Sequence, residues 1–319
     1  MIKIDIHQHL WTEPLVRALA RRQELPFVRH EQGLTVLFGA GERPYAIDLA
    51  SEAPARRAAL VARDGLDRAL VCLSSPLGIE SLPRAQSLPL LDAYHEGALA
   101  LGDPFGVWGA LALDRPEPAD VEDALDRGCV GISLPAGALA GAARLARLRP
   151  VLARLELRGA PLLVHPGPAA PTVAGEASLG DPLWWPALTR YVAEMHAAWL
   201  AFLHAGRSEH PELRIVFSML AGLAPLHAER LASRGGPDRC KRGREHDPLT
   251  FYDTSSYGPA GIGAFTEAIG SPGQLLYGSD RPVVEPTLLE EPAALDWDLL
   301  ADTAGRALGG IQAQVEAVR

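Results

Sequence analysis

Cysteines and long apolar runs are scarce in this sequence. Only three cysteines occur in 319 residues, and Cys72, Cys129 and Cys240 form no Cys-x-x-Cys pair. We therefore expect two small buried side chains and one loop thiol, without a disulfide framework. No apolar run reaches membrane-spanning length, and the first residues are typical of a strand rather than of a signal peptide. These absences favour a cytoplasmic, reducing compartment and exclude a membrane partner.

Basic charge is also scarce. The chain has 30 Lys and Arg residues against 39 Asp and Glu residues, a net charge of −9. The densest basic cluster is only Lys241, Arg242 and Arg244. Proteins that bind nucleic acid usually present a basic face, so this class is excluded and a small-molecule substrate is expected. The Gly-x-Ser-x-Gly elbow, the phosphate-binding Gly-x-x-x-x-Gly-Lys motif and EF-hand spacing are all missing as well.

What the sequence does contain is a regular alternation of short apolar runs with longer amphipathic ones. The runs predict eight strands, at 2–6, 69–73, 105–113, 130–134, 161–164, 213–219, 249–252 and 274–277. Helical spacing fills the gaps, at 55–64, 89–101, 118–127, 142–158, 188–205, 224–234 and 259–269. Eight strand–helix units predict an α/β fold, a (β/α)₈ TIM barrel. The rival, a doubly wound open sheet, would normally carry a Gly-rich turn where this chain has His-Gln-His.

Two segments lie outside this repeat. Residues 12–50 follow the first strand, and the runs 27–30 and 34–38 around Gln32-Gly33 predict a small β-hairpin insertion. The insertion is expected on the mouth side of the barrel, where it would cover a site as a lid. Residues 283–319 predict C-terminal helices on the barrel exterior. No linker divides the chain, so residues 1–319 are expected to form one domain.

Histidines and an aspartate stand where the predicted strands end. His7 and His9 are two apart on the first strand and therefore project from the same face. His165 ends the fifth strand and Asp280 ends the eighth. A single histidine there is usually a core or surface residue, and a single aspartate is often a helix cap. Four such residues at the ends of three strands instead favour a metal site, because catalytic groups of these barrels gather there.

The same segments resemble a known family. The His-x-His of the first strand, Leu-Leu-Val-His-Pro-Gly, the Pro-Glu-Leu-Arg-Ile-Val-Phe run and Leu-Leu-Tyr-Gly-Ser-Asp-Arg-Pro are similar to the amidohydrolase superfamily. They resemble its branch with aminocarboxymuconate-semialdehyde decarboxylase and related decarboxylases, hydratases and lactonases. The resemblance implies metal ligands at His7, His9, His165 and Asp280, with His165 and Asp280 catalytic. It also implies that Asp280 accepts a proton from metal-activated water, and that a homodimer is possible.

The identity of the metal stays open on this basis. Three imidazoles and a carboxylate suit Zn²⁺, and Mn²⁺ or Fe²⁺ would also fit.

One position departs from the family pattern. The family places a histidine at the end of the sixth strand, where this chain has Met219. Methionine cannot transfer a proton. His196, His204 or His227 could replace that histidine from a helix, or could be ordinary helical residues.

Other residues near the expected mouth are candidate substrate contacts. Trp184 and Trp185 could stack on a planar substrate or pack in the lid. Asp253 and Tyr257 could contact substrate, and Asp253 could instead orient a ligand histidine. Arg281 could bind a substrate carboxylate or form an ion pair.

Three functions follow from these patterns. The first is hydrolysis of a C–N or C–O acyl bond in a small organic substrate by metal-activated water. The second is non-oxidative decarboxylation of an aromatic or unsaturated acid. The third, which Met219 suggests, is a catalytically impaired barrel that serves as a binding subunit.

Overall fold

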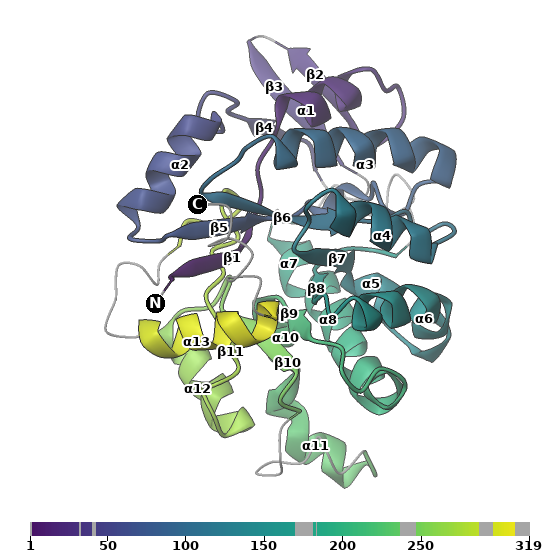
Figure 1. Ribbon diagram of the computed structural model, residues 1–319, viewed down its shortest axis with the longest axis vertical. Helices are drawn as coiled ribbons and strands as arrows, with labels where there is room; N and C mark the ends of the chain where they lie inside the picture. The colour runs from purple at the N-terminus through teal and green to yellow at the C-terminus, as the bar shows by residue number, and fades with distance from the viewer. Residues whose placement is uncertain are drawn as a thin grey trace.

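Eight parallel strands form one sheet that curls into a barrel, which confirms the predicted fold. The computed structural model describes residues 2–31, 33–39, 43–169, 181–182, 184–236, 247–286 and 296–309 (Figure 1). Neighbouring strands follow the order β1-β5-β6-β7-β8-β9-β10-β11. Their bounds are β1 Ile4–Gln8, β5 Arg68–Val71, β6 Phe105–Ala110, β7 Gly131–Pro135, β8 Leu162–His165, β9 Ile215–Phe217, β10 Thr250–Asp253 and β11 Leu275–Leu276.

Backbone contacts between the first and last strands bring the two edges of the sheet together. The Ile6 amide donates to the Tyr277 carbonyl at 2.9 Å, and Gln8 forms a parallel bridge with Arg281. Two further bonds beyond the strand ends join His9 to Arg281 and Asp280 to His7, at 2.7 and 2.9 Å. The closure therefore fixes the segment that carries Asp280 beside the one that carries the first two histidines.

Alternation along each strand separates the barrel interior from the outer layer. Leu163 on β8 packs with Ile6, Trp108 and Val216 in an interior cluster. Its neighbours Leu162 and Val164 belong to the larger cluster that includes the surrounding helices. Because both faces are apolar, these strands are continuous hydrophobic runs in the sequence, as expected for a parallel sheet covered on both sides.

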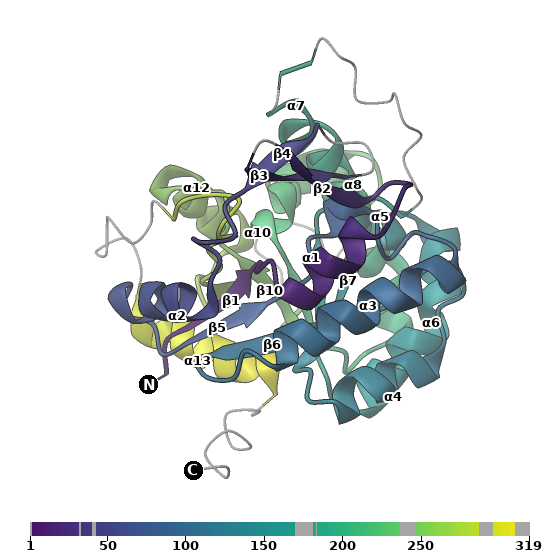
Figure 2. The same ribbon diagram turned by 90° about the horizontal axis from the view of Figure 1, so that it is seen from above.

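Helices surround the strands, as Figures 1 and 2 show. Each α-helix has the following bounds: α1 Glu13–Ala20, α2 Pro54–Arg63, α3 Arg84–Leu99, α4 Pro118–Asp126, α5 Ala136–Leu139, α6 Ala142–Leu157, α7 Trp185–Leu188, α8 Arg190–Ala201, α9 Arg207–Glu209, α10 Met219–Gly222, α11 Ala228–Ser233, α12 Pro259–Ile269 and α13 Trp297–Leu308. In the described part of the chain, no helix combines the length and apolarity needed to cross a bilayer.

The C-terminal helix closes one end of the barrel. Asp296 caps α13 by accepting a hydrogen bond from the Leu299 amide, and Gly309 ends it in a left-handed conformation. Its residues Ala304 and Ala307 pack into the same cluster as the interior strand residues. Of the C-terminal helices predicted over 283–319, α13 is the one within the described residues, and it covers the barrel interior rather than only its exterior; residues 287–295 and 310–319 lie outside the described residues.

The insertion after β1 is larger than the predicted hairpin. β2 (Phe27–Glu31) and β3 (Leu34–Phe38) pair antiparallel as expected, and a third strand, β4 (Tyr45–Ile47), pairs with β3. The short helix α1 precedes them and was not predicted. Its single buried stripe spans only eight residues, too few for a clear helical period. Figure 2 shows this small sheet on the same side of the molecule as α7.

Some predicted helix boundaries were wrong. α3 begins at Arg84, and Pro89, taken as the first helical residue, lies inside the helix. The single helix expected over 188–205 is divided into α7, α8 and a π-helical turn at Phe202–Gly206. The segment 224–234 likewise begins as a 3₁₀ turn, Ala224–His227, before α11. Tertiary packing sets such boundaries, which local periodicity does not report.

Candidate metal centre

Three imidazole rings meet at the mouth of the barrel. His7 lies on β1, His9 is the first residue after that strand, and His165 is the last residue of β8. The ring centroids are 4.8 to 5.1 Å apart, and each pair of rings is nearly perpendicular. All three side chains are buried. The structure therefore brings together the histidines that the sequence places on the first and fifth strands.

A neighbour fixes the Nδ1 atom of each ring. His9 Nδ1 donates to the Cys72 carbonyl at 3.0 Å, and His165 Nδ1 donates to the Pro166 carbonyl at 2.7 Å. Carbonyl oxygens only accept hydrogen bonds, so each ring carries a proton on Nδ1, and a neutral ring then presents the lone pair of Nε2.

The third ring is held by a carboxylate. His7 Nδ1 donates to Asp253 Oδ2 at 2.8 Å. Asp253 is fully buried, and burial alone would raise its pKa. The adjacent His7 and hydrogen bonds from Ser255 outweigh that effect and hold the pKa of Asp253 below its ordinary value. Asp253 is thus placed to orient a histidine, the second of its two predicted roles.

The Nε2 atoms face one another. His9 Nε2 and His165 Nε2 are 3.2 Å apart, and His7 Nε2 is buried without a hydrogen-bond partner among the described residues. Burial, and then the neighbouring His7 and His9, hold the pKa of His165 well below its ordinary value. Neutral rings in this arrangement direct their Nε2 lone pairs at one region, so the cluster fits a divalent metal bound through nitrogen.

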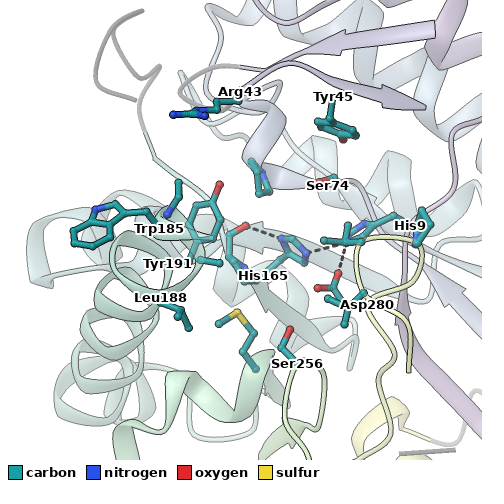
Figure 3. Close-up of a pocket in the computed structure, with 18 of the residues that line it drawn as sticks. His9, Arg43, Tyr45, Ser74, His165, Trp185, Leu188, Tyr191, Ser256 and Asp280 are labelled. Atoms are coloured by element: carbon teal, nitrogen blue, oxygen red, sulfur yellow. Dashed lines mark hydrogen bonds and ion pairs between the residues drawn. The ribbon is translucent and has the colours of Figure 1, made fainter. Parts of the chain in front are cut away.

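Asp280 completes the predicted set. Its Oδ1 atom lies 3.0 Å from His9 Nε2 and 3.6 Å from His7 Nε2 (Figure 3). Its side chain is 14% exposed, whereas the histidine side chains are almost fully buried. Asp280 has a left-handed backbone, with φ 57°, which turns the chain sharply after β11. It is therefore the member of the set that opens toward solvent.

A thiol joins the cluster that the sequence did not assign to it. Cys72, just after β5, is 2% exposed, and its Sγ lies 3.6 Å from His9 Nδ1. Ligand atoms of His7, His9, Cys72 and His165 all lie within 4.8 Å of one another. The expectation of a merely buried cysteine was therefore incomplete. Cys72 follows a barrel strand just as the histidines do, and that position is the signal that could have identified it.

A cavity of about 910 Å³ lies over the cluster. His9, His165 and Asp280 line its base, and Tyr45 of the insertion and Trp185 of α7 line it farther out (Figure 3). Aromatic, apolar and a few charged groups make up the rest, among them Trp11, Arg43, Leu188, Arg190, Tyr191 and Tyr257. The insertion therefore covers the site, as the sequence suggests, and Arg43, Arg190 and Tyr191 are lining residues that sequence patterns did not single out.

Three predicted substrate contacts do not line this cavity, namely Trp184, Arg281 and Asp253, which instead holds His7. Trp184 is 55% exposed and lies beside Trp185, with ring centroids 5.7 Å apart. Arg281 is buried and pairs with Asp64 at 2.6 Å and Glu285 at 3.3 Å. For Arg281 the ion pair is thus the role that the geometry supports.

Met219 lines the cavity, at the position after β9 where the family resemblance predicts a histidine. The backbone from Met219 to Leu223 is left-handed at every residue, which is costly for side chains other than glycine. A hydrogen bond from the Met219 amide to Asp253 Oδ1, 3.0 Å long, helps to hold this turn.

No predicted replacement for the missing histidine reaches the cavity. His196 Nε2 contacts the Gly222 carbonyl at 2.5 Å, and the His196 ring faces His227. His204 is exposed. None of the three lines the cavity.

Comparison with known proteins identifies one family and several solved structures with a similar fold. A family model described as Amidohydrolase matches residues 4–309. A search of curated proteins found no match. Among solved structures, the chain is similar to a 5-carboxyvanillate decarboxylase from Sphingomonas paucimobilis, with 18% identity, TM-score 0.69, and 96% of this chain and 98% of that chain covered.

Two further structures are similar. One is a mutant of a 5-carboxyvanillate decarboxylase from Novosphingobium aromaticivorans with bound manganese, with 15% identity, TM-score 0.66 and 97% of both chains covered. The other is a 2,6-dihydroxybenzoate decarboxylase from Rhizobium, with 15% identity, TM-score 0.66, and 97% of this chain and 99% of that chain covered. At such identities these likenesses establish the barrel fold.

Proposed function

The chain belongs to the amidohydrolase family, and from this premise we propose that it is a metal-dependent decarboxylase of a small aromatic or unsaturated acid. The observation that carries the proposal is a largely apolar cavity with aromatic walls, whose base is the histidine cluster that could hold a metal ion. The decarboxylase names of the similar structures support it. Hydrolysis, the first hypothesis from the sequence, becomes the second candidate.

His7, His9, His165 and Asp280 would hold the metal. A divalent ion bound there supplies positive charge that orients the substrate's oxygens and stabilises developing negative charge.

The cavity walls would position the acid. Trp185 and Tyr191 offer flat surfaces for a planar ring, and Arg190 and Arg43 supply positive charge near the cavity wall. Stacking and ion pairing together would hold the substrate carboxylate close to the metal.

Asp280 would manage the proton. In decarboxylation the bond between the ring carbon and the carboxylate breaks, its electron pair stays on the ring carbon, and CO₂ leaves. That carbon then needs one proton. Asp280, the partly exposed member of the cluster, would relay that proton from solvent to the carbon. The balance is one carboxylate and one proton converted to CO₂ and the decarboxylated product.

Met219 favours hydrolysis, the second candidate function. Methionine can neither donate a proton nor polarise a carboxylate. Hydrolysis of an acyl bond would need only one proton acceptor for the attacking water, and Asp280 could be that acceptor. Metal-dependent hydrolysis of a C–N or C–O acyl bond is therefore retained.

The test is product analysis with the metal-loaded protein. It is incubated with dihydroxybenzoates and 5-carboxyvanillate, and in parallel with a panel of amides, esters and lactones. CO₂ release matched to loss of acid supports decarboxylation. Acyl cleavage without CO₂ replaces it with hydrolysis. A preparation without stoichiometric metal that turns over none of them contradicts both and favours the binding-subunit hypothesis.

A further inference from the structure

Cys72 approaches the histidine cluster from the side opposite Asp280. Its side chain belongs to the cluster that fills the barrel interior, together with Ile6 and Trp108. It does not line the substrate cavity, whereas Asp280 does. The thiol interacts with the rings of both His7 and His9. One side of the cluster is thus occupied by a carboxylate and the other by a sulfur atom.

The sulfur lies at the edge of the cluster, 3.6 Å from His9 Nδ1 and within 4.8 Å of one ring nitrogen of each histidine. Each Nδ1 atom already donates to an oxygen, and His7 Nε2 is buried with no hydrogen-bond partner among the described residues. A buried nitrogen lone pair without a partner costs free energy. A metal ion would take up that lone pair.

We propose that Cys72 is an additional ligand of the metal centre, as a thiolate, and that the centre therefore takes Zn²⁺ or Co²⁺ in preference to Mn²⁺ or Mg²⁺. The inference rests on the proposed metal centre. As the metal–sulfur bond forms, the sulfur–hydrogen bond breaks and its proton passes to solvent, with no change of oxidation state.

Ligand softness connects the cysteine to the choice of metal. Thiolate is a soft ligand that suits zinc and similar ions, whereas Mn²⁺ and Mg²⁺ prefer oxygen ligands. The similar 5-carboxyvanillate decarboxylase from Novosphingobium aromaticivorans was solved with manganese. Cys72 predicts that this chain has a different preference.

Cobalt provides the direct test. The protein is produced in cobalt-supplemented medium, so that no metal-free form has to be prepared, and bound Co²⁺ is quantified by elemental analysis. The wild type is expected to show a thiolate-to-cobalt charge-transfer band in the near ultraviolet that scales with bound cobalt. Cys72→Ser should lose that band while its visible ligand-field bands, which report bound Co²⁺, remain. Cys129→Ser is the matched control, since Cys129 is also buried and free but packs in the outer cluster, and it should keep the band.

Competition between metals separates a ligand from a residue that merely supports the His9 ring. Loss of an outer-shell partner costs about 10- to 100-fold in metal affinity, whatever the metal. Cys72→Ser should lower Zn²⁺ affinity by more than that and leave Mn²⁺ affinity nearly unchanged.

Two results would overturn the inference. Wild-type protein with stoichiometric Co²⁺ and no near-ultraviolet band would exclude Cys72 as a ligand and leave the proposed metal centre intact. Wild-type protein that binds no Co²⁺, Zn²⁺ or Mn²⁺ would remove the metal centre itself, and the inference with it.

Discussion

His9 and His165 point their Nε2 atoms at each other across 3.2 Å, while a backbone carbonyl holds the far side of each ring. Each carbonyl requires a proton on the Nδ1 atom of its ring, so a neutral ring presents a lone pair at Nε2. The carboxylate of Asp280 lies 3.0 Å from His9 Nε2, at the same end of the ring. A divalent cation would satisfy both Nε2 atoms and this carboxylate at once, and this relationship gives the first prediction.

His165→Ala is expected to reduce bound metal to well below one equivalent without collapse of the fold. The ring contributes a ligand atom, whereas the barrel is held by its interior and outer clusters. Elemental analysis and thermal unfolding measure the two effects. His204→Ala, at an exposed helical position, should keep its metal. Unchanged metal content in His165→Ala, together with a large fall in Tm, would make His165 a core residue.

Asp253→Asn is expected to weaken metal binding although it barely changes shape. Asp253 Oδ1 accepts hydrogen bonds from Met219 and Ser255, which an amide oxygen can also do. The amide nitrogen would then face His7 Nδ1 and force the ring proton onto Nε2, where it blocks the metal. We expect affinity to fall about 10- to 100-fold. Asp247→Asn, in the Arg207 ion pair, is the control, and equal losses in both variants would contradict this role.

Asp280→Asn is expected to lower turnover much more than substrate binding. The amide can still contact the cluster but cannot carry the proton that either proposed reaction needs. Steady-state kinetics on a substrate identified by product analysis would show a reduced kcat with KM changed little. An unchanged kcat would remove Asp280 from proton transfer.

Strand ends were the part of the site that the sequence could predict. A strand of four to six apolar residues is a local pattern, and its last residue is known to within one or two positions. His7, His165 and Asp280 therefore could be assigned to one mouth before any contact was known. Cys72 stands at an equivalent place, but cysteine is so often a small core residue that its type alone carries no such signal.

Contacts between distant segments could not be predicted in this way. Whether Arg281 points into the cavity or toward Asp64 depends on the packing of α2 against the segment after β11, which no local pattern encodes. The same holds for Trp184 and Trp185, adjacent residues of which only the second lines the cavity. Their difference in placement leads to a paired prediction.

Trp185→Ala is expected to raise KM for the identified substrate, whereas Trp184→Ala should leave it nearly unchanged. Only Trp185 faces the cavity, where stacking on a planar ring contributes about 0.5–1.5 kcal/mol, or roughly two- to tenfold in binding. The two residues have similar exposure, at 44% and 55%, so the pair controls for general loss of an exposed indole. Equal effects of the two substitutions would exclude a specific stacking role for Trp185.

Acid is expected to destabilise the barrel through protonation of His95, which lies on the buried face of α3. His95 Nε2 accepts a hydrogen bond from the Ala110 amide at 3.0 Å, so the ring is neutral in the folded protein. Burial, and then the positive charge of Arg127, lower the pKa of His95 from 6.5 to about 4. The unfolded chain therefore takes up a proton near pH 6.5, while the folded protein resists it until about pH 4.

The direction of the pH dependence follows from this difference between the pKa of His95 in the folded and the unfolded protein. Stability from this residue is fully present above pH 6.5 and is lost as the pH falls toward 4. A difference of this size corresponds to about 3 kcal/mol at most. His95→Gln keeps an acceptor for Ala110 and does not titrate. Urea unfolding of both proteins, from neutral pH down to the native pKa, should show a smaller loss of stability in the variant. Parallel curves for the two proteins would mean that other groups cause the acid sensitivity, because the His95 contribution would then be absent.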